Sequence, residues 1–456
     1  MAFAPAVLKR PFALALVFAL PAAVVAVLQL GRLHPDEVFQ SLEPANWRAF
    51  GYGVLAWEWQ QGLRNWVVPG LFSWLLKACA AVGLDHPLAR RAVLEVPQWL
   101  LHAAMLLSVY RFAERRVGAL AVWAFPLVGL SGLVLHFAGR TMGEAWSAAF
   151  LVWGLERLDA RGVRPSAEGG LVLGLAVVAR YGSAVMVAAA VLLVLAQRRW
   201  KDALAALGGG LVAAALLGAV DWATWGKPFH SFLAYLDYNV LSGQAAQAFG
   251  AEPGWYYLPL FGWLVLWAWP GLVFGVRPRA FESKPVWWLA FPAVAYAVAI
   301  SLTAHKEARF LYPALVLLAV AAVPGWLSVL SRVQAPERRQ LFLTASVRVA
   351  LSVVAFESPF APQRPQQFRL WVRASREATG VVLVNEGMWG SPGFFYLGKN
   401  LPWFPCDFPQ DPNFQMAMRD GRFNRAVIWD DRALAELEAA GFKVLEVDGP
   451  GKLLGR

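Results

Sequence analysis

Two adjacent carboxylates, Asp36 and Glu37, follow His34 and the helix-breaking Pro35 at the end of the first apolar run. Charged side chains are costly beside hydrocarbon, so such a pair at the mouth of an apolar segment indicates a substrate site. A carboxylate within hydrogen-bond reach can remove the proton of a reacting hydroxyl. The alternative is structural, because these acids could instead cap a helix and interact with its dipole.

A second charged cluster, which contains His305, Lys306, Glu307 and Arg309, lies between two later apolar runs. Lys and Arg bind phosphate groups, and Arg does so through a two-pronged fork. Carboxylates and cations together would suit the transfer of a sugar from a lipid phosphate to a hydroxyl. The alternative is that Lys306 and Arg309 only anchor a helix at the membrane interface.

Other polar residues fall in connections between apolar runs. A structural role is open for four of them: Arg180 and Glu144 could form an ion pair, Asp221 could cap a loop and Glu58 could belong to an interfacial anchor. The further polar residues of these connections are Glu43, Arg64, Arg140, Thr141, Asn239 and Gln244.

The composition is that of a membrane protein, because 58% of the 456 residues are hydrophobic and 16% are charged. Soluble domains carry about 25% charged residues. The net charge of +11 does not indicate nucleic acid, since the basic residues fall in short clusters between apolar runs, as in cytoplasmic loops. Cys79 and Cys406 are far apart, and we expect no disulfide framework, no metal and no cofactor.

The apolar runs predict membrane-spanning helices, because about 20 residues cross the hydrocarbon core. We place spans at residues 11–33, 92–110, 117–137, 143–156, 202–220, 257–276, 286–304, 310–330 and 341–356. The run 169–196 is interrupted at Arg180 and has basic residues on both flanks, which favours two short passes with Arg180 at the tip. The result is about 11 passes, with the N-terminus inside and the polar candidates outside.

The last hundred or so residues differ in character. Short strands are predicted near 380–384, 425–429 and 443–447, with a helix over 431–440. We therefore expect a membrane domain over residues 1–356 and a small α/β domain over 357–456 on the non-cytoplasmic face. The inverted repeat of many transporters is not visible in the sequence.

The stretch from His34 to Pro44, continued by Gly51–Trp59, closely resembles the first outer loop of glycosyltransferase family 22. These are polyprenyl-phosphate-mannose-dependent mannosyltransferases of GPI-anchor and N-glycan assembly. The stretch from His305 to Pro313 resembles the other hallmark of the family, with Ala308 where a second acid is usual. Further matches are Arg64 with Pro69, Arg140-Thr141 with Glu144, Arg180, Asp221 through Asn239, Ser391-Pro392 and the Pro405-Cys406 region.

The resemblance implies a polytopic α-helical GT-C fold and an inverting transfer of mannose, or a related hexose, from a polyprenyl-phosphate-sugar donor. The acceptor would be a hydroxyl of a glycan or glycolipid, and membrane lipids would be the other partner. The family's acidic pair falls on Asp36 and Glu37. We assign donor phosphate or substrate binding to His305, Lys306, Glu307, Arg309, Arg180 and Arg64, and acceptor or supporting contacts to His34, Glu43, Glu58, Arg140, Glu144, Asp221 and Asn239.

The sequence has no Asn-x-Ser/Thr sequon and is rich in Arg and Ala, which fits a bacterial source. We therefore expect a multi-pass protein of the bacterial inner membrane, with its active site and C-terminus on the periplasmic side. A transporter or flippase of lipid-linked sugars is the alternative function.

Overall fold

The computed structural model describes residues 10–28, 34–264, 268–275, 285–332, 365–384, 391–406, 410–429 and 431–456, with isolated positions between 336 and 344. The chain forms two compact units. The first unit consists of Met1–Ala26, Glu58–Val67 and Glu95–Pro359. The second unit consists of Val27–Trp57, Val68–Leu94 and Phe360–Arg456. The predicted domain boundary at 356/357 lies outside the described residues. The C-terminal residues share a unit with two N-terminal segments.

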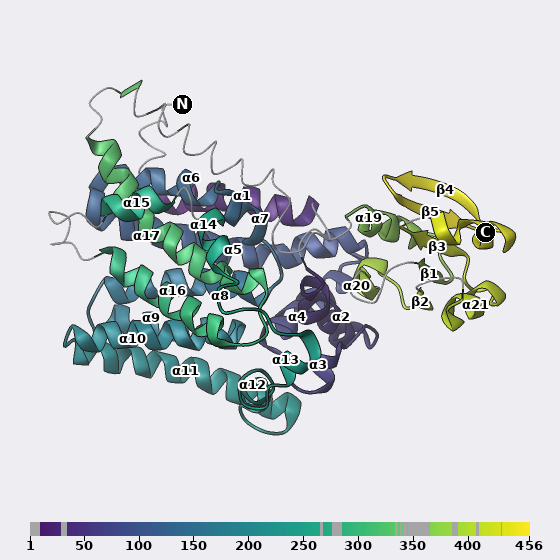
Figure 1. The fold of residues 1–456 in the computed structure, drawn as a ribbon, viewed down its shortest axis with the longest axis horizontal. Helices are drawn as coiled ribbons and strands as arrows, with labels where there is room; N and C mark the ends of the chain where they lie inside the picture. Colours follow the sequence, from purple (N-terminus) through teal and green to yellow (C-terminus); the bar gives the residue numbers. More distant parts are fainter. Residues whose placement is uncertain are drawn as a thin grey trace. The chain divides into compact units, whose positions relative to one another are not determined.

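The first unit is a bundle of helices (Figure 1). Among the described residues, four helical segments are long and apolar enough to cross a membrane: Pro11–Leu28, Pro87–Gly129, Trp200–Trp225 and Ala308–Ser331. The helices are α1 (Pro11–Leu28), α5 (Pro87–Val117, which begins in the second unit), α6 (Ala124–Gly129), α7 (Gly132–Phe137), α8 (Gly143–Asp159), α9 (Val163–Ala179), α10 (Ala184–Ala196), α11 (Trp200–Trp225), α12 (His230–Leu236), α13 (Gln244–Phe249), α14 (Leu258–Leu264), α15 (Ala268–Gly275), α16 (Pro285–Leu302) and α17 (Tyr312–Ser331).

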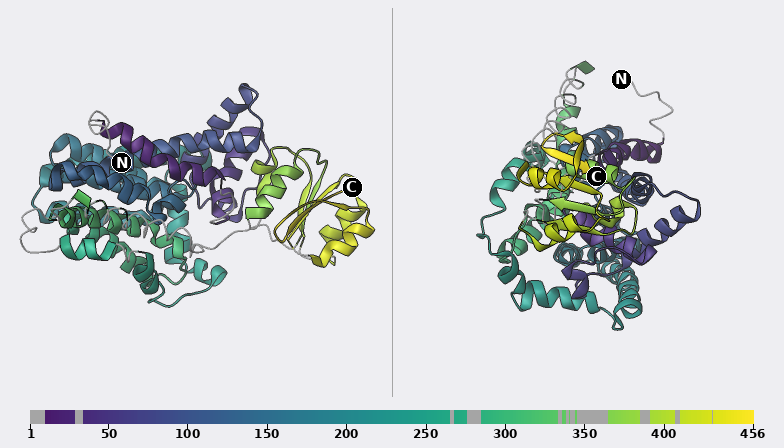
Figure 2. Two further views of the ribbon diagram at one scale, coloured as in Figure 1. Left: turned by 90° about the horizontal axis from the view of Figure 1, so that it is seen from above. Right: turned by 90° about the vertical axis from the view of Figure 1, so that its right-hand side faces the viewer.

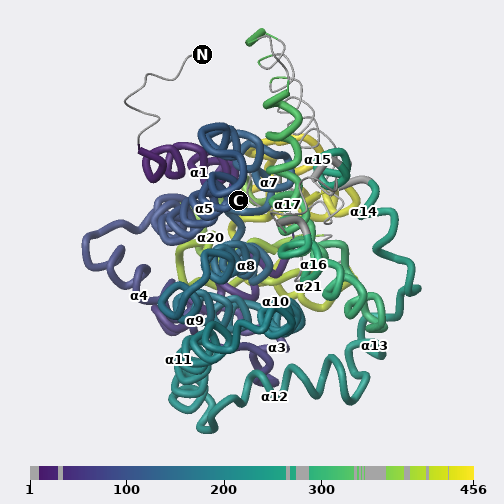
Figure 3. Tube along the Cα trace, turned by 90° about the vertical axis from the view of Figure 1, so that its left-hand side faces the viewer, coloured from purple at the N-terminus to yellow at the C-terminus, as the bar shows by residue number. Residues whose placement is uncertain are grey.

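The interrupted run 169–196 forms a helical hairpin. Gly170 of α9 lies against Ala206 of α11, and Gly174 lies against Ala213, so α9 and α11 run in the same direction. Because α10 connects them, it is the return pass, and Figure 3 shows these helices nearly end-on. The prediction that Arg180 lies at the tip of a broken pair is confirmed.

Ion pairs hold the end of the bundle at which α8 finishes. Glu156 of α8 binds Arg115 at 2.6 Å, and Asp159 binds Arg116 at 2.8 Å. Arg199 donates to the carbonyl of Leu158 at 2.7 Å. Basic residues from three connections between apolar runs therefore meet at one end of α8, namely Arg115 and Arg116, Arg157, and Arg199, while Glu144 lies at the other end.

Several predicted spans differ from the helices observed. The segment 117–137 is divided into a 3-10 helix, η2 (Gly118–Trp123), followed by α6 and α7. Gly118 adopts a φ of 58°, which ends α5, and Ser131 starts α7 by accepting the Val134 N–H. Span 257–276 contains α14 and α15, and nearly all of 341–356 lies outside the described residues. The number of passes therefore stays a prediction.

The second unit joins a polar N-terminal segment to a small sheet. Its N-terminal elements are η1 (Glu37–Leu42), α2 (Glu43–Phe50) and α4 (Val67–Ala81), which was not predicted; α3 (Trp57–Gln60) links the units in sequence. The C-terminal elements are α19 (Pro365–Ala374), β1 (Val381–Val384), α20 (Gly393–Leu397), β2 (Trp403–Cys406), α21 (Pro412–Arg419), β3 (Arg425–Ile428), α22 (Leu434–Ala439), β4 (Lys443–Asp448) and β5 (Gly451–Gly455).

The sheet has the order β2-β1-β3-β5-β4. Strands β2, β1 and β3 are parallel, and β5 pairs in antiparallel fashion with both β3 and β4. Alternate residues point to opposite faces, so Val382 and Ile428 pack with Phe414 of α21 and Leu437 of α22, while α19 packs on the other face (Figure 2). The three predicted strands are confirmed, and β2 and β5 were not predicted. Pro405 argues against a central strand, yet β2 is an edge strand, where proline is tolerated.

Candidate active site

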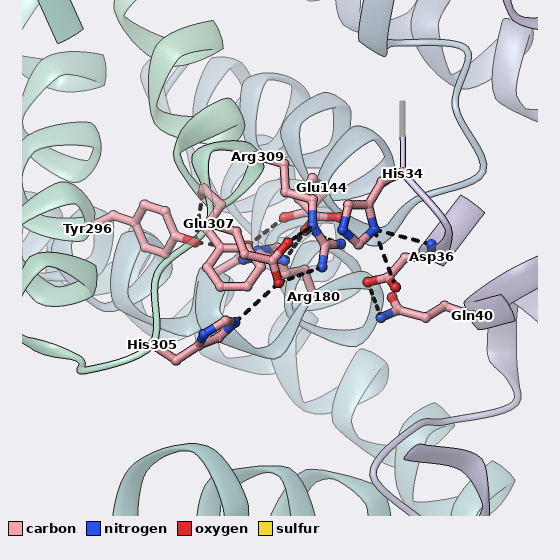
Figure 4. Close-up of polar contacts among 12 residues, drawn as sticks. His34, Asp36, Gln40, Glu144, Arg180, Tyr296, His305, Glu307 and Arg309 are labelled. Atoms are coloured by element: carbon pink, nitrogen blue, oxygen red, sulfur yellow. Dashed lines mark hydrogen bonds and ion pairs between the residues drawn. The ribbon is translucent and has the colours of Figure 1, made fainter. Parts of the chain in front are cut away.

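Asp36 begins the helical segment η1, and its carboxylate is held by two neighbouring side chains (Figure 4). The Gln40 amide donates to Oδ2 of Asp36. His34 Nδ1 accepts the backbone N–H of Asp36 at 3.2 Å and lies 3.4 Å from Oδ1. Asp36 is 5% exposed, and its side chain makes no capping hydrogen bond to η1. Asp36 thus occupies the N-cap position without a capping hydrogen bond, and Glu37 lies in the first turn, so an interaction of both acids with the helix dipole remains the structural alternative.

Glu37 has a different environment from its neighbour. Its Oε1 lies 3.5 Å from the guanidinium of Arg91, and both side chains are buried. Arg91 belongs to α5 and was not among the predicted site residues, because the predicted span began at residue 92. The doublet Arg90-Arg91 directly before an apolar run was the available signal. The two adjacent acids thus have separate partners.

Glu43 lies at the start of α2 and is completely buried. Its carboxylate accepts the N–H of Val54 at 2.7 Å and the N–H of Phe395 at 2.6 Å. Burial raises the pKa of Glu43 to about 7, and the backbone N–H groups only partly offset that effect. Glu43 is therefore a buried link within the second unit.

In the first unit, Glu144 lies between two arginines (Figure 4). Its Oε1 is 2.5 Å from Arg180 and 3.3 Å from Arg309. Arg309 also forms a fork with Glu307, with Nε 2.6 Å from Oε2 and Nη2 3.0 Å from Oε1. His305 Nε2 lies 3.2 Å from Glu307. The predicted Arg180–Glu144 pair is confirmed, and it belongs to a larger charged cluster.

Aromatic residues complete this cluster. The guanidinium carbons of Arg180 and Arg309 lie 4.7 Å and 5.1 Å from the ring centre of Phe310, within the range of cation–π attraction. The Tyr296 hydroxyl accepts from Nε of Arg180 at 3.4 Å and donates to the Phe310 carbonyl at 3.0 Å. Phe310 was inside the quoted motif, whereas Tyr296 lay unnoticed in a predicted span.

Lys306 is engaged with the backbone. Its ammonium donates to the carbonyls of Glu252, Thr303 and Ala304, and the residue is 5% exposed. These contacts fix the chain directly after α16 against the segment before α14. The lysine thereby sets the course of the loop that carries His305 and Glu307.

The remaining predicted residues make mainly local contacts. Arg64 pairs with Glu58 at 2.5 Å. Asp221 accepts the N–H and hydroxyl of Ser231, so its role as a cap is confirmed. The Asn239 amide donates to the Tyr235 carbonyl, Arg140 Nε donates to the His136 carbonyl, Thr141 is buried, and Gln244 begins α13.

The structure thus defines two groups of candidate residues, one in each unit. In the second unit, Asp36 is an oriented carboxylate suited to accept a proton. In the first unit, the arginine cluster is suited to bind an anion. Among the described residues, no group of three or more His, Cys, Asp or Glu is arranged to hold a metal ion. The group in the second unit contains His34, Asp36, Gln40, Glu37, Arg91 and Glu43. The group in the first unit contains Glu144, Arg180, Tyr296, His305, Glu307, Arg309 and Phe310.

Comparison with known sequences identifies one family. The Alg9-like mannosyltransferase family matches residues 3–361. GPI mannosyltransferase 3 of Yarrowia lipolytica is 32% identical over 340 residues, which cover 70% of this chain and 62% of that protein. GPI alpha-1,2-mannosyltransferase 3 of Xenopus laevis is 26% identical over 291 residues, covering 62% and 54%. The chain thus matches less than two thirds of the length of these relatives.

Comparison with solved structures identifies the fold. ArnT from Cupriavidus metallidurans bound to undecaprenyl phosphate gives a TM-score of 0.62 at 13% identity, covering 99% of this chain and 98% of that chain. The archaeal oligosaccharyltransferase AglB from Archaeoglobus fulgidus gives 0.52 at 13% identity, covering 95% and 70%. The predicted fold class, a polytopic α-helical GT-C protein with a small C-terminal α/β domain, is confirmed.

Proposed function

Because the chain belongs to the Alg9-like mannosyltransferase family, we propose that it transfers mannose, or a related hexose, from a polyprenyl-phosphate-linked donor to a glycan or glycolipid hydroxyl. The observation that carries this proposal is Asp36, a nearly buried carboxylate oriented by His34 and Gln40 at the start of a helix. An oriented carboxylate is what a general base for a hydroxyl requires.

In the proposed reaction, Asp36 takes the proton of the acceptor hydroxyl while the hydroxyl oxygen attacks the anomeric carbon. The bond from that carbon to the phosphate oxygen breaks, and the polyprenyl phosphate leaves with the electron pair. Attack from the side opposite the phosphate inverts the anomeric configuration. Glu37 supports Asp36 through its ion pair with Arg91, which fixes the following residue of the same helical segment.

Arg309 and Arg180 are the proposed ligands of the donor phosphate. In the structure, the Arg309 fork holds the carboxylate of Glu307, which has two oxygens arranged as a phosphate would present them. Glu307 is 27% exposed at its side chain, whereas Arg309 is 6% exposed, so the acid lies on the accessible side of the pair. We propose that the phosphate replaces Glu307, which keeps His305 as its partner, and that Lys306 acts by holding the loop.

We further propose that the protein lies in a bacterial inner membrane, with the active site and the C-terminal domain on the periplasmic side. The gathering of basic clusters at the end of α8 opposite Glu144 supports the orientation. Composition and the absence of sequons support the bacterial source, while the sequence relatives compared above are eukaryotic. The similarly folded ArnT was solved with undecaprenyl phosphate, a polyprenyl phosphate.

The test uses purified protein in detergent with polyprenyl-phosphate-mannose and a glycolipid acceptor. Asp36→Asn should lower turnover roughly 10²- to 10⁴-fold, the usual contribution of a general base, while donor affinity persists. Near-normal turnover of Asp36→Asn would overturn the assignment. If Glu37→Gln were the more damaging change, the roles of the two acids would be exchanged.

The same preparation distinguishes the enzyme from a flippase. Detergent solution has no second compartment, so transfer or release of mannose there requires chemistry rather than transport. A protein that binds the donor but never cleaves its sugar phosphate bond, under any acceptor tried, would favour the flippase.

A further inference from the structure

The reaction proposed above leaves Glu43 without a role, although its environment is specialised. The Glu43 carboxylate joins α2 to α20, which lies 352 positions later in the chain. It accepts one N–H from Val54 and one from Phe395, and the residue has 0% exposure. Burying a carboxylate is costly unless its oxygens are hydrogen-bonded, so these two amides are what makes the position tolerable.

The C-terminal domain is shaped around this carboxylate. Gly393 has a φ of +72°, and a Cβ added there would lie 2.5 Å from Oε1 of Glu43. The Gly393 N–H donates to the Ser391 hydroxyl oxygen at 3.0 Å, and the Gly393 carbonyl accepts the Trp371 indole N–H at 3.0 Å. The backbone that receives Glu43 is therefore held on both sides, and only glycine fits next to the acid.

A continuous helical backbone connects Glu43 to Asp36. Asp36, Leu42 and Glu43 all have right-handed helical φ and ψ angles, so η1 passes into α2 without a break. The two acids are seven positions apart in sequence, at the two ends of the π-helical turn formed by Glu37–Leu42. A hydrogen-bonded helix is stiff over this length, so a shift of Glu43 moves the start of η1 as well.

We propose that Glu43 is a positioning residue through which the C-terminal domain fixes the catalytic segment that begins at Asp36. The proposal rests on the proposed function of Asp36 as the base. The C-terminal domain then takes part in the reaction without supplying a reacting group. Its backbone amides hold Glu43, and Glu43 holds the helical segment that presents Asp36.

Kinetics of Glu43→Gln and Glu43→Ala test the proposal. A displacement of about 1 Å can cost 10²-fold in rate, so kcat should fall at least tenfold in Glu43→Ala. Donor Kd should be unchanged, because the proposed phosphate ligands belong to the other unit. Glu43→Gln keeps one acceptor oxygen and should recover part of kcat. A folded Glu43→Ala protein with the kcat of the wild type would overturn the proposal.

The glycine that begins α20 and the glycine that follows its last residue provide a matched pair. Gly393 and Gly398 have φ values of +72° and +70°, so alanine strains the backbone equally at both. An alanine Cβ meets Glu43 only at position 393, since the nearest atom at 398 is 3.5 Å away and belongs to Pro87. Gly393→Ala should lower kcat at least tenfold with donor Kd unchanged, whereas Gly398→Ala should keep kcat within about twofold. Equal kcat values for the two variants would contradict the proposal.

A double-mutant cycle separates this proposal from the proposed function. In a Glu43→Ala background the clash is gone, so Gly393→Ala should lower the unfolding temperature less than it does in the wild type. Additive effects would overturn the contact, whatever reaction the protein catalyses. Conversely, a wild-type protein that transfers no sugar would overturn the proposed function while the cycle still reports on Glu43. If the wild type is active and Asp36→Asn is inactive, the proposed function holds. A fully active Gly393→Ala protein would then overturn only the positioning role of Glu43.

Discussion

At the scale of single residues, identical side-chain types serve different purposes according to their partners. Asp36 and Glu37 are adjacent acids, yet one is oriented by neutral or titratable groups and the other is paired with a buried arginine. Lys306 and Arg309 are three positions apart, yet the ammonium binds backbone carbonyls and the guanidinium binds carboxylates. A test of either motif must therefore address each residue separately.

Arg309→Ala should weaken donor binding by about ten- to a hundredfold, because hydrogen bonds to charged groups contribute about 1.5–3 kcal/mol. Arg309→Lys should recover only part of the affinity, since lysine lacks the planar fork. Direct binding of polyprenyl-phosphate-mannose to purified protein is the measurement. The control is Arg115→Ala, a residue of α5 that pairs with Glu156 at the other end of α8. Unchanged donor affinity with a raised acceptor KM would assign the cluster to the acceptor.

The Glu43 carboxyl predicts how stability depends on pH. Its folded pKa of about 7 lies above the ordinary value of 4.5, so the folded state binds the extra proton between these values. The resulting stabilisation, about 3 kcal/mol at 1.36 kcal/mol per pKa unit, is complete below pH 4.5 and is lost as the pH rises through 7.

Unfolding temperatures in detergent between pH 5 and pH 8 check this sign. The advantage of the wild type over Glu43→Gln should shrink as the pH rises, because glutamine does not titrate. A constant difference between the two proteins across this range would show that Glu43 has the same pKa in the folded and unfolded states.

At the scale of elements, glycines set how closely α9 and α11 approach. A Cβ at Gly174 would lie 2.5 Å from the Cβ of Ala213, whereas a Cβ at Gly208 of α11 would meet nothing within 4 Å. Close packing between these helices places the hairpin tip, and with it Arg180, at the end where α8 begins. Small residues have the same function in many membrane helix pairs.

Gly174→Ala should destabilise the protein by about 1–3 kcal/mol, the usual cost of overpacking. Gly208→Ala should be neutral or slightly stabilising, because alanine favours an exposed helix by about 0.5–1 kcal/mol over glycine. Thermal unfolding of the two variants gives the comparison. A destabilisation of equal size at both positions would argue against close packing of α9 on α11.

At the scale of the whole molecule, the orientation in the membrane is the property that assigns the proposed site to one face. Cysteines introduced at positions 230 and 420 should react with an impermeant reagent from the outside, and cysteines at 160 and 335 should not. The background must first lose Cys79 and Cys406, both of which are buried free thiols. Labelling at 335 would overturn the odd number of passes and the shared face of the two motifs.

The sequence by itself determined the class of the protein. Long apolar runs and clustered basic residues require a multi-pass membrane protein, because each property follows from local composition. The hairpin at Arg180 was also predictable, since both flanks of its run are basic. The motif at His34 to Pro44 and the motif at His305 to Pro313 also indicated the family, and the match over residues 3–361 confirmed the family. The roles of the candidate residues within these motifs stay predictions.

Only the tertiary structure decided what each candidate touches. Arg91 and Tyr296 were missed, and Glu43 was placed only among acceptor or supporting contacts, because their partners are distant in sequence and nothing local predicts the pairing. Phe395 binds Glu43 across 352 positions, and Arg309 binds Glu144 across 165. Burial and long-range hydrogen bonding assign such roles, and both depend on which segments pack together rather than on the residues beside them in the chain.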